Sequence, residues 1–97
     1  MPTYVTLMKL TEQGVKSIKD FPQRLEAAKK GMEAMGGKMD GFYAVLGEYD
    51  YVAIAEMPSD EAGMQFVLGL NALGNVKTTT FKAFTESEFI DIVKKMP

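Results

Sequence analysis

The sequence predicts an α+β domain built on a four-stranded antiparallel sheet, with two crossover helices and a further helix at the C-terminus. Two observations predict this class. Short runs rich in β-branched and aromatic residues alternate with longer segments whose apolar residues recur at helical spacing. The chain has 97 residues, which suits one domain with a modest core. We therefore expect a single domain over residues 1–97.

The first strand and the start of the first helix are predicted by residues 3–10 and by Thr11. Residues 3–10 are too short for a helix of ordinary length and are rich in strand-forming side chains. Thr11 can cap a helix whose first turn contains Glu12. Apolar residues then recur at helical spacing, at Val15, Ile18, Pro22, Leu25, Ala28, Met32 and Met35.

Pro22 interrupts this helical segment. A proline inside a regular helix removes a backbone donor and costs about 3 kcal/mol. The helix should therefore kink or restart near Asp20 and Phe21. Gly36 and Gly37 should end it, because glycine adopts the left-handed backbone conformation at little steric cost.

A hairpin is predicted in the middle of the chain. Residues 38–47 and 50–57 indicate the second and third strands, joined by the tight connection Gly47-Glu48-Tyr49-Asp50. The next helix should begin after Pro58-Ser59-Asp60-Glu61, which supplies a stop, a cap and two acidic residues, and should end at Gly74-Asn75.

The fourth strand is predicted over residues 76–84, where three consecutive threonines favour extended backbone. Thr85 and Glu88 then form a capping-box pattern for a short terminal helix with an apolar stripe. The resulting order is β-α-β-β-α-β with one extra helix. That order is typical of a ferredoxin-like fold, in which both crossover helices cover one face of the sheet.

The opposite face of the sheet also requires cover. Residues 41–46 and 51–55 are apolar at both parities, whereas a solvent-facing antiparallel strand alternates apolar with polar residues. The helix after residue 60 is likewise apolar around its axis, at Met64, Phe66, Val67, Leu68, Leu70, Ala72 and Leu73. We expect burial against a second copy, with two sheets facing each other in a dimeric α/β barrel. The alternative is that the terminal helix covers part of this surface.

Composition excludes several classes of function. A formal charge of -2, from 11 basic and 13 acidic residues, does not favour nucleic-acid binding. The absence of cysteine and histidine removes the common zinc, haem and transition-metal ligands and the usual nucleophile and base pairs, so we expect no cofactor and no metal site. No signal-like or membrane-spanning stretch is present, so we expect no membrane association and a cytoplasmic location.

Several motifs together resemble the GYD domain family. They include Thr3-Tyr4-Val5, residues 10–14, Gly41-Phe42-Tyr43, Gly47-Glu48-Tyr49-Asp50 and Leu73-Gly74-Asn75-Val76. The resemblance covers nearly the whole chain and implies membership of the dimeric α/β-barrel superfamily. That superfamily includes cofactor-free oxygenases, isomerases, haem-dependent enzymes and effector-binding proteins, so the resemblance leaves the reaction open. The lack of histidine and tryptophan weakens the oxygenase interpretation.

The candidate ligand-binding residues surround the predicted hairpin. They are Phe42, Tyr43, Glu48, Tyr49 and Asp50. Phenol rings suit stacking on an organic ligand, and a carboxylate beside them can act as a base or hold a polar group. The competing interpretation is local turn chemistry, with Gly47 supplying an unusual backbone angle and Asp50 bonding to nearby amides.

Three functional hypotheses follow. The first is a homo-oligomeric binding or assembly module that holds a small organic molecule between sheet and helices. The second is a cofactor-independent monooxygenase or isomerase acting on a small aromatic or enolisable substrate, with Glu48 or Asp50 as base and Tyr43 or Tyr49 as donor. The second hypothesis requires these side chains to enter a cavity. The third is a purely structural partner-binding subunit, which predicts a filled interior and a conspicuous exposed patch. For Arg24, the only arginine, we expect a surface ion pair, and the alternative is that it anchors an acidic side chain or a ligand carboxylate.

Overall fold

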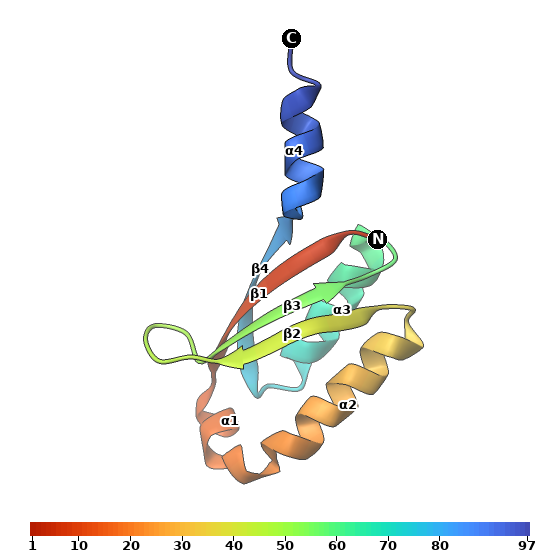
Figure 1. Ribbon diagram of the computed structural model, residues 1–97. Coiled ribbons are helices and arrows are strands. Elements are labelled where there is room, and N and C mark those ends of the chain that lie inside the picture. Colours follow the sequence, from red (N-terminus) through yellow and green to blue (C-terminus); the bar gives the residue numbers. More distant parts are fainter.

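The computed structural model describes all 97 residues (Figure 1). Four strands and four helices follow one another in the expected order, with one short 3-10 turn, η1. Their bounds are β1 Thr3–Leu10, α1 Glu12–Lys16, η1 Ile18–Asp20, α2 Phe21–Ala34, β2 Lys38–Ala44, β3 Tyr51–Glu56, α3 Asp60–Ala72, β4 Val76–Ala83 and α4 Glu86–Lys94.

The sheet has the strand order β2-β3-β1-β4, and all neighbouring strands are antiparallel. This is the ferredoxin-like arrangement, so the predicted fold class is confirmed. Helices α2 and α3 both lie against one face of the sheet (Figure 1). Each is the crossover of a split β-α-β unit, and the right-handedness of such crossovers places both on the same side.

The predicted break in the first helical segment is confirmed. Thr11 caps α1 by accepting a hydrogen bond from the Gly14 amide at 3.1 Å. The chain then tightens into η1 and restarts as α2, with Pro22 in the first turn. Proline is tolerated there because the first amides of a helix have no intrahelical acceptor.

The hairpin differs from the prediction in its bounds. Strand β2 ends at Ala44 rather than at residue 47, and β3 begins at Tyr51. Residues 45–50 form the connection, which the Val45 amide closes by donating to the Asp50 carbonyl at 2.9 Å. Asp50 also bonds sideways to β1: its amide donates to the Met8 carbonyl, and its Oδ2 accepts from the Leu10 amide at 2.8 Å. Strand β4 likewise ends one residue early, at Ala83.

The core is small and lies between the sheet and the helices. One buried cluster contains Met8, Tyr51, Ala53 and Val76, and a second contains Met32, Ala55 and Met57. Only 10 of the 97 residues are buried, so much of the apolar side-chain surface of one copy remains accessible.

Helix α4 stands apart from the rest of the molecule (Figure 1). Its capping box is formed as predicted, with Thr85 Oγ1 accepting from the Glu88 amide and Glu88 accepting from the Thr85 amide. All residues from 84 to 97 are nevertheless exposed. The radius of gyration is 14.7 Å, above the value of about 13 Å typical of a compact 100-residue domain. The alternative in which this helix covers the sheet is therefore wrong for a single copy.

Candidate functional site

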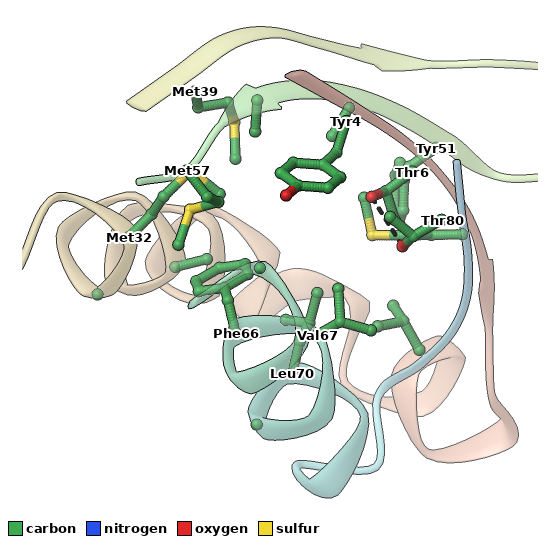
Figure 2. A pocket seen from close by; sticks show the side chains of 18 of the residues that line it. Tyr4, Thr6, Met32, Met39, Tyr51, Met57, Phe66, Val67, Leu70 and Thr80 are labelled. Atoms are coloured by element: carbon green, nitrogen blue, oxygen red, sulfur yellow. Dashed lines mark hydrogen bonds between the residues drawn. The ribbon is translucent and has the colours of Figure 1, made fainter. Parts of the chain in front are cut away.

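A cavity of about 650 Å³ lies between the sheet, α2 and α3 (Figure 2). Of its 31 lining residues, 21 are hydrophobic, so its walls suit an apolar ligand rather than a polar one. The floor comes from alternate residues of the central strands, because side chains of one parity share a sheet face. Residues that border the space in Figure 2 are Tyr4, Thr6, Met32, Met39, Met57, Phe66, Val67 and Leu70.

Glycines on both helices help to keep this space open. Gly31 on α2 and Gly69 on α3 line the cavity, and a methyl group added at either would meet no atom within 4 Å. Neither has a positive φ, so neither is required by the backbone. Gly63 differs, because a methyl group there would lie 3.2 Å from the Tyr4 ring. It allows that ring to lie close against α3.

A polar cluster borders the cavity where α3 begins. The Tyr4 hydroxyl donates to Asp60 Oδ1, and Lys82 Nζ donates to Asp60 Oδ2 at 3.1 Å. The Tyr4 bond, followed by Lys82, lowers the pKa of Asp60. Burial and then the bond to Asp60 raise the pKa of Tyr4 to about 12. Thr6 and Thr80 share a hydroxyl hydrogen bond of 3.0 Å nearby (Figure 2).

We expect Tyr4→Phe to raise the pKa of Asp60 toward its ordinary value, because the largest cause of its lowering is removed. A lowered folded pKa contributes stability above the unfolded value, and this contribution is lost as pH falls through the folded value. The stability advantage of the wild type over the variant should therefore be full above pH 3.8 and disappear as the pH falls through the folded pKa of Asp60, so the stability of the wild type falls more steeply on acidification. Carboxyl chemical shifts followed by NMR across acid titration measure this pKa directly.

The matched control for this prediction is Tyr49→Phe, since Tyr49 lies in the hairpin connection and makes no contact with Asp60. The Asp60 titration should be the same in this control as in the wild type. An Asp60 titration that Tyr4→Phe leaves unchanged would show that Lys82 alone sets its pKa.

The other end of the cavity is aromatic. Phe21, Phe42 and Tyr51 pack together, with Phe21 stacked on Tyr51 at a ring-centroid distance of 4.8 Å. Burial, and then Asp50, raises the pKa of Tyr51. Arg24 also lines this space, and its Nη1 donates to the carbonyl oxygen of Ser17 at 2.7 Å and to Ser17 Oγ at 3.1 Å.

The prediction that Arg24 forms a surface ion pair is wrong. Its guanidinium forms no salt bridge, and the carboxylates that pair with cations do so with lysines instead. Arg24 Nη2 is enclosed by the protein and has no hydrogen-bond partner. The physical reason is position: residue 24 lies in the first part of α2, where its side chain turns inward to the end of α1.

The residues predicted around the hairpin are not brought together at one site. Phe42 lines the cavity, whereas Tyr43 lies on the opposite face of the sheet, beside Val52. Glu48 is exposed and pairs with Lys9 at 3.5 Å, and the Tyr49 ring lies 5.3 Å from the same ammonium group. Asp50 holds the Leu10 amide. In a single copy Glu48, Tyr49 and Asp50 lie outside the cavity lining.

Sequence reasoning missed three of the polar residues that border the cavity, namely Tyr4, Asp60 and Lys82, and named Arg24 as a ligand contact only as an alternative. A signal for two of them was present: in the β1–β4 register Tyr4 faces Lys82, and residues opposite each other share a face. Asp60 was interpreted only as a first-turn acid of α3. Asp60 does lie in the first turn of α3, and its carboxylate also binds Tyr4 and Lys82.

Besides the cavity, the structure has a second candidate binding surface, the open face of the sheet, which no helix covers (Figure 1). Its residues alternate with those that line the cavity, and the register pairs Val5 with Ile54 and Leu7 with Val52. We use the term open face for Val5, Leu7, Tyr43, Val52, Ile54 and Phe81. Tyr43 is 60% and Phe81 52% exposed, which is unusual for aromatic residues in a sheet.

The fold and these two surfaces define a ferredoxin-like domain with an apolar cavity on one side of the sheet and an uncovered apolar face on the other. The chain belongs to the GYD domain family, whose profile matches residues 4–93. It is 32% identical over 95 residues to the "Glutamine synthetase and cystathionine beta-lyase binding protein" of Thermus thermophilus. That alignment covers 97% of this chain and 100% of the relative.

Two solved structures show the same fold. The crystal structure of MtbAldR has a TM-score of 0.68 at 19% identity, covering 88% of this chain and 52% of that one. A feast or famine regulatory protein from M. tuberculosis, complexed with L-methionine, has a TM-score of 0.65 at 19% identity, covering 88% and 51%. This chain therefore spans about half the length of these two proteins.

None of the helices combines the length and the apolar character that a membrane span requires.

Proposed function

We propose that this protein is a homo-oligomeric binding module in which two copies pair through their open faces. The observation that carries this proposal is the amount of exposed surface. One copy has an accessible area of 6689 Å², about 1,200 Å² more than the roughly 5,500 Å² expected for a monomer of this mass. A stable interface buries about 800 Å² on each partner, so the excess is of the size that pairing would remove.

The position of the apolar residues supports pairing through the sheet. The middle of the open face comes from the two central strands, β1 and β3, whose outward residues Val5, Leu7, Val52 and Ile54 are all apolar, whereas a solvent-facing sheet has polar residues at such positions. Two such faces packed against each other would form the closed α/β barrel. Helix α4 adds to the argument, since an isolated helix this short is marginal in water and its apolar residues Phe89, Ile92 and Val93 have no partner in one copy.

We further propose that the oligomer binds other proteins, with enzymes of amino-acid metabolism as the first candidates. The support is the relative from T. thermophilus, which is named for binding glutamine synthetase and cystathionine β-lyase and which matches this chain over its full length. The exposed hairpin connection offers a contact surface separate from the open face, since its adjacent apolar residues Val45 and Leu46 are 38% and 103% exposed.

The small organic ligand is proposed to lie in the cavity between sheet and helices. Its volume falls in the range of about 300 to 1,000 Å³ that is usual for ligand pockets. Methionines from α2, β2 and the end of β3 supply adaptable apolar walls. Turnover by the hairpin residues would need Glu48, Tyr49 and Asp50 to enter a cavity, and in one copy they lie outside it. Binding is therefore the function that the geometry supports best.

Native mass spectrometry of protein purified gently from its own host tests these proposals. The native mass should be a multiple of the mass of one chain, 10.7 kDa, and the oligomer should carry an extra mass that denaturation removes. An empty oligomer would support assembly and contradict the ligand. A stable monomer would contradict pairing, and would require another explanation for the uncovered sheet face.

A further inference from the structure

The charged side chains that line the cavity do not cancel. They are Arg24, Asp60 and Lys82, while all other lining residues are apolar or neutral. Lys82 and Asp60 form an ion pair at 3.1 Å and compensate each other. Arg24 has no acidic partner, so one positive charge of the lining is not compensated.

Arg24 is also incompletely hydrogen-bonded. Both protons of Nη1 are committed to Ser17, whereas Nη2 is enclosed and donates to nothing. It is the one buried side-chain nitrogen or oxygen in the molecule that lacks a partner. A buried donor without an acceptor is costly, and more so when it carries charge. The planar guanidinium is also the side chain best suited to bind an oxyanion with two parallel hydrogen bonds, which here would come from Nε and Nη2 once the guanidinium turns toward the cavity.

We propose that the cavity selects an apolar monoanion, such as an aromatic or branched carboxylate, whose charged group is held by Arg24. This inference rests on the proposed ligand-binding role of the cavity and narrows the ligand to one chemical class. The aromatic cluster of Phe21, Phe42 and Tyr51 lies at the same end and would contact the part of the molecule next to the anion. The methionine-lined walls would take the remaining apolar body.

The test uses two fluorescent probes of nearly the same shape. Anilinonaphthalene sulfonate is an apolar monoanion, and phenylnaphthylamine is its neutral counterpart without the sulfonate. In a cavity without an unpaired cation the neutral probe should bind at least as tightly, because it is cheaper to desolvate. We expect the anionic probe to bind at least about 10-fold more tightly than the neutral one, since a hydrogen bond to a charged group strengthens binding by about 10-fold or more.

The matched variants are Arg24→Gln and Lys30→Gln. Both remove one positive charge from α2, but Lys30 is exposed and does not line the cavity. Arg24→Gln should weaken the anionic probe about 10-fold and leave the neutral probe unchanged, whereas Lys30→Gln should change neither.

Thr6→Phe fills the cavity from the sheet, where Thr6 points inward (Figure 2). Thr6→Phe should abolish binding of both probes. Circular dichroism verifies that each of the three variants is folded.

The possible outcomes separate the two proposals. If both probes bind equally, Thr6→Phe blocks both and Arg24→Gln has no effect, the anion inference is overturned and the apolar cavity remains supported. If probe binding is insensitive to Thr6→Phe, the dyes occupy another surface, and both the ligand site and its preference for anions are contradicted. Loss of the anionic probe alone in Arg24→Gln supports the inference.

Discussion

Replacing Gly14 with alanine should lower the free energy of unfolding by about 3 kcal/mol, at the upper end of the usual cost of overpacking. The added methyl group would overlap the backbone carbonyl oxygen of Asn75 and lie 3.0 Å from Leu10 Cδ2. The Asn75 backbone is held in place by hydrogen bonds and cannot move aside as a flexible side chain could. The Asn75 carbonyl accepts from the Thr11 amide at 3.0 Å, and Thr11 Oγ1 donates to the Gly74 carbonyl at 2.6 Å. These bonds join the start of α1 to the turn between α3 and β4.

The control is the same substitution at a glycine in open space. Gly31→Ala should raise the free energy of unfolding by about 0.5 to 1 kcal/mol, because alanine is the better helix former and no atom lies within 4 Å of its methyl group. Urea denaturation of the two variants measures both effects, with the slope of the transition as a check on two-state behaviour. Equal effects of the same sign at the two positions would contradict the close packing of Gly14.

Replacing Ile54 with glutamate should disperse the proposed oligomer. Ile54 lies in the open face opposite Val5 of β1 and Gly41 of β2, at the centre of the sheet. A charge buried there without a partner costs several kcal/mol, and a symmetric interface contains it in both copies. The dimer dissociation constant should therefore rise by about 100-fold or more, at 1.4 kcal/mol for each factor of ten. Sedimentation velocity over a concentration series measures this constant.

Val15→Glu provides the matched control for this experiment. Val15 is 57% exposed on α1, away from the open face, so the same new charge should leave the sedimentation profile unchanged. Circular dichroism should show that both variants keep the fold, since Ile54 lies outside the two buried clusters. A wild-type oligomer that survives Ile54→Glu intact would place the interface elsewhere, with α4 as the next surface to test.

The order and type of the elements could be predicted because their signals are local. Thr11, Ser59 and Thr85 cap α1, α3 and α4 through contacts within three residues, and Gly36 and Gly74 have the positive φ expected where helices end. Pro22 marked the restart of the helix for the same reason. The hairpin bounds were less accurate, because Asp50 bonds to β1, a strand that is distant in sequence.

The candidate site depended on contacts that sequence spacing does not report. The aromatic and acidic residues near Gly47 form a dense group in the sequence, yet strand alternation sends Phe42 and Tyr43 to opposite faces of the sheet. Tyr4, Asp60 and Lys82, by contrast, come from three separate elements and meet at one cavity. The sequence favoured a surface ion pair for Arg24. Only the packing of α2 against the end of α1 shows that its guanidinium turns inward.

The sequence by itself determined the ferredoxin-like fold, the GYD family and the excess of apolar surface, because helix caps, breakers and side-chain periodicity act over a few residues. The tertiary structure alone decided where that surface lies: the open face, the cavity between α2 and α3, and the separated α4. It also decided which charge in the cavity lacks a partner. The physical reason is that electrostatic compensation and burial depend on distances between residues remote in sequence, and those distances exist only once the chain is folded.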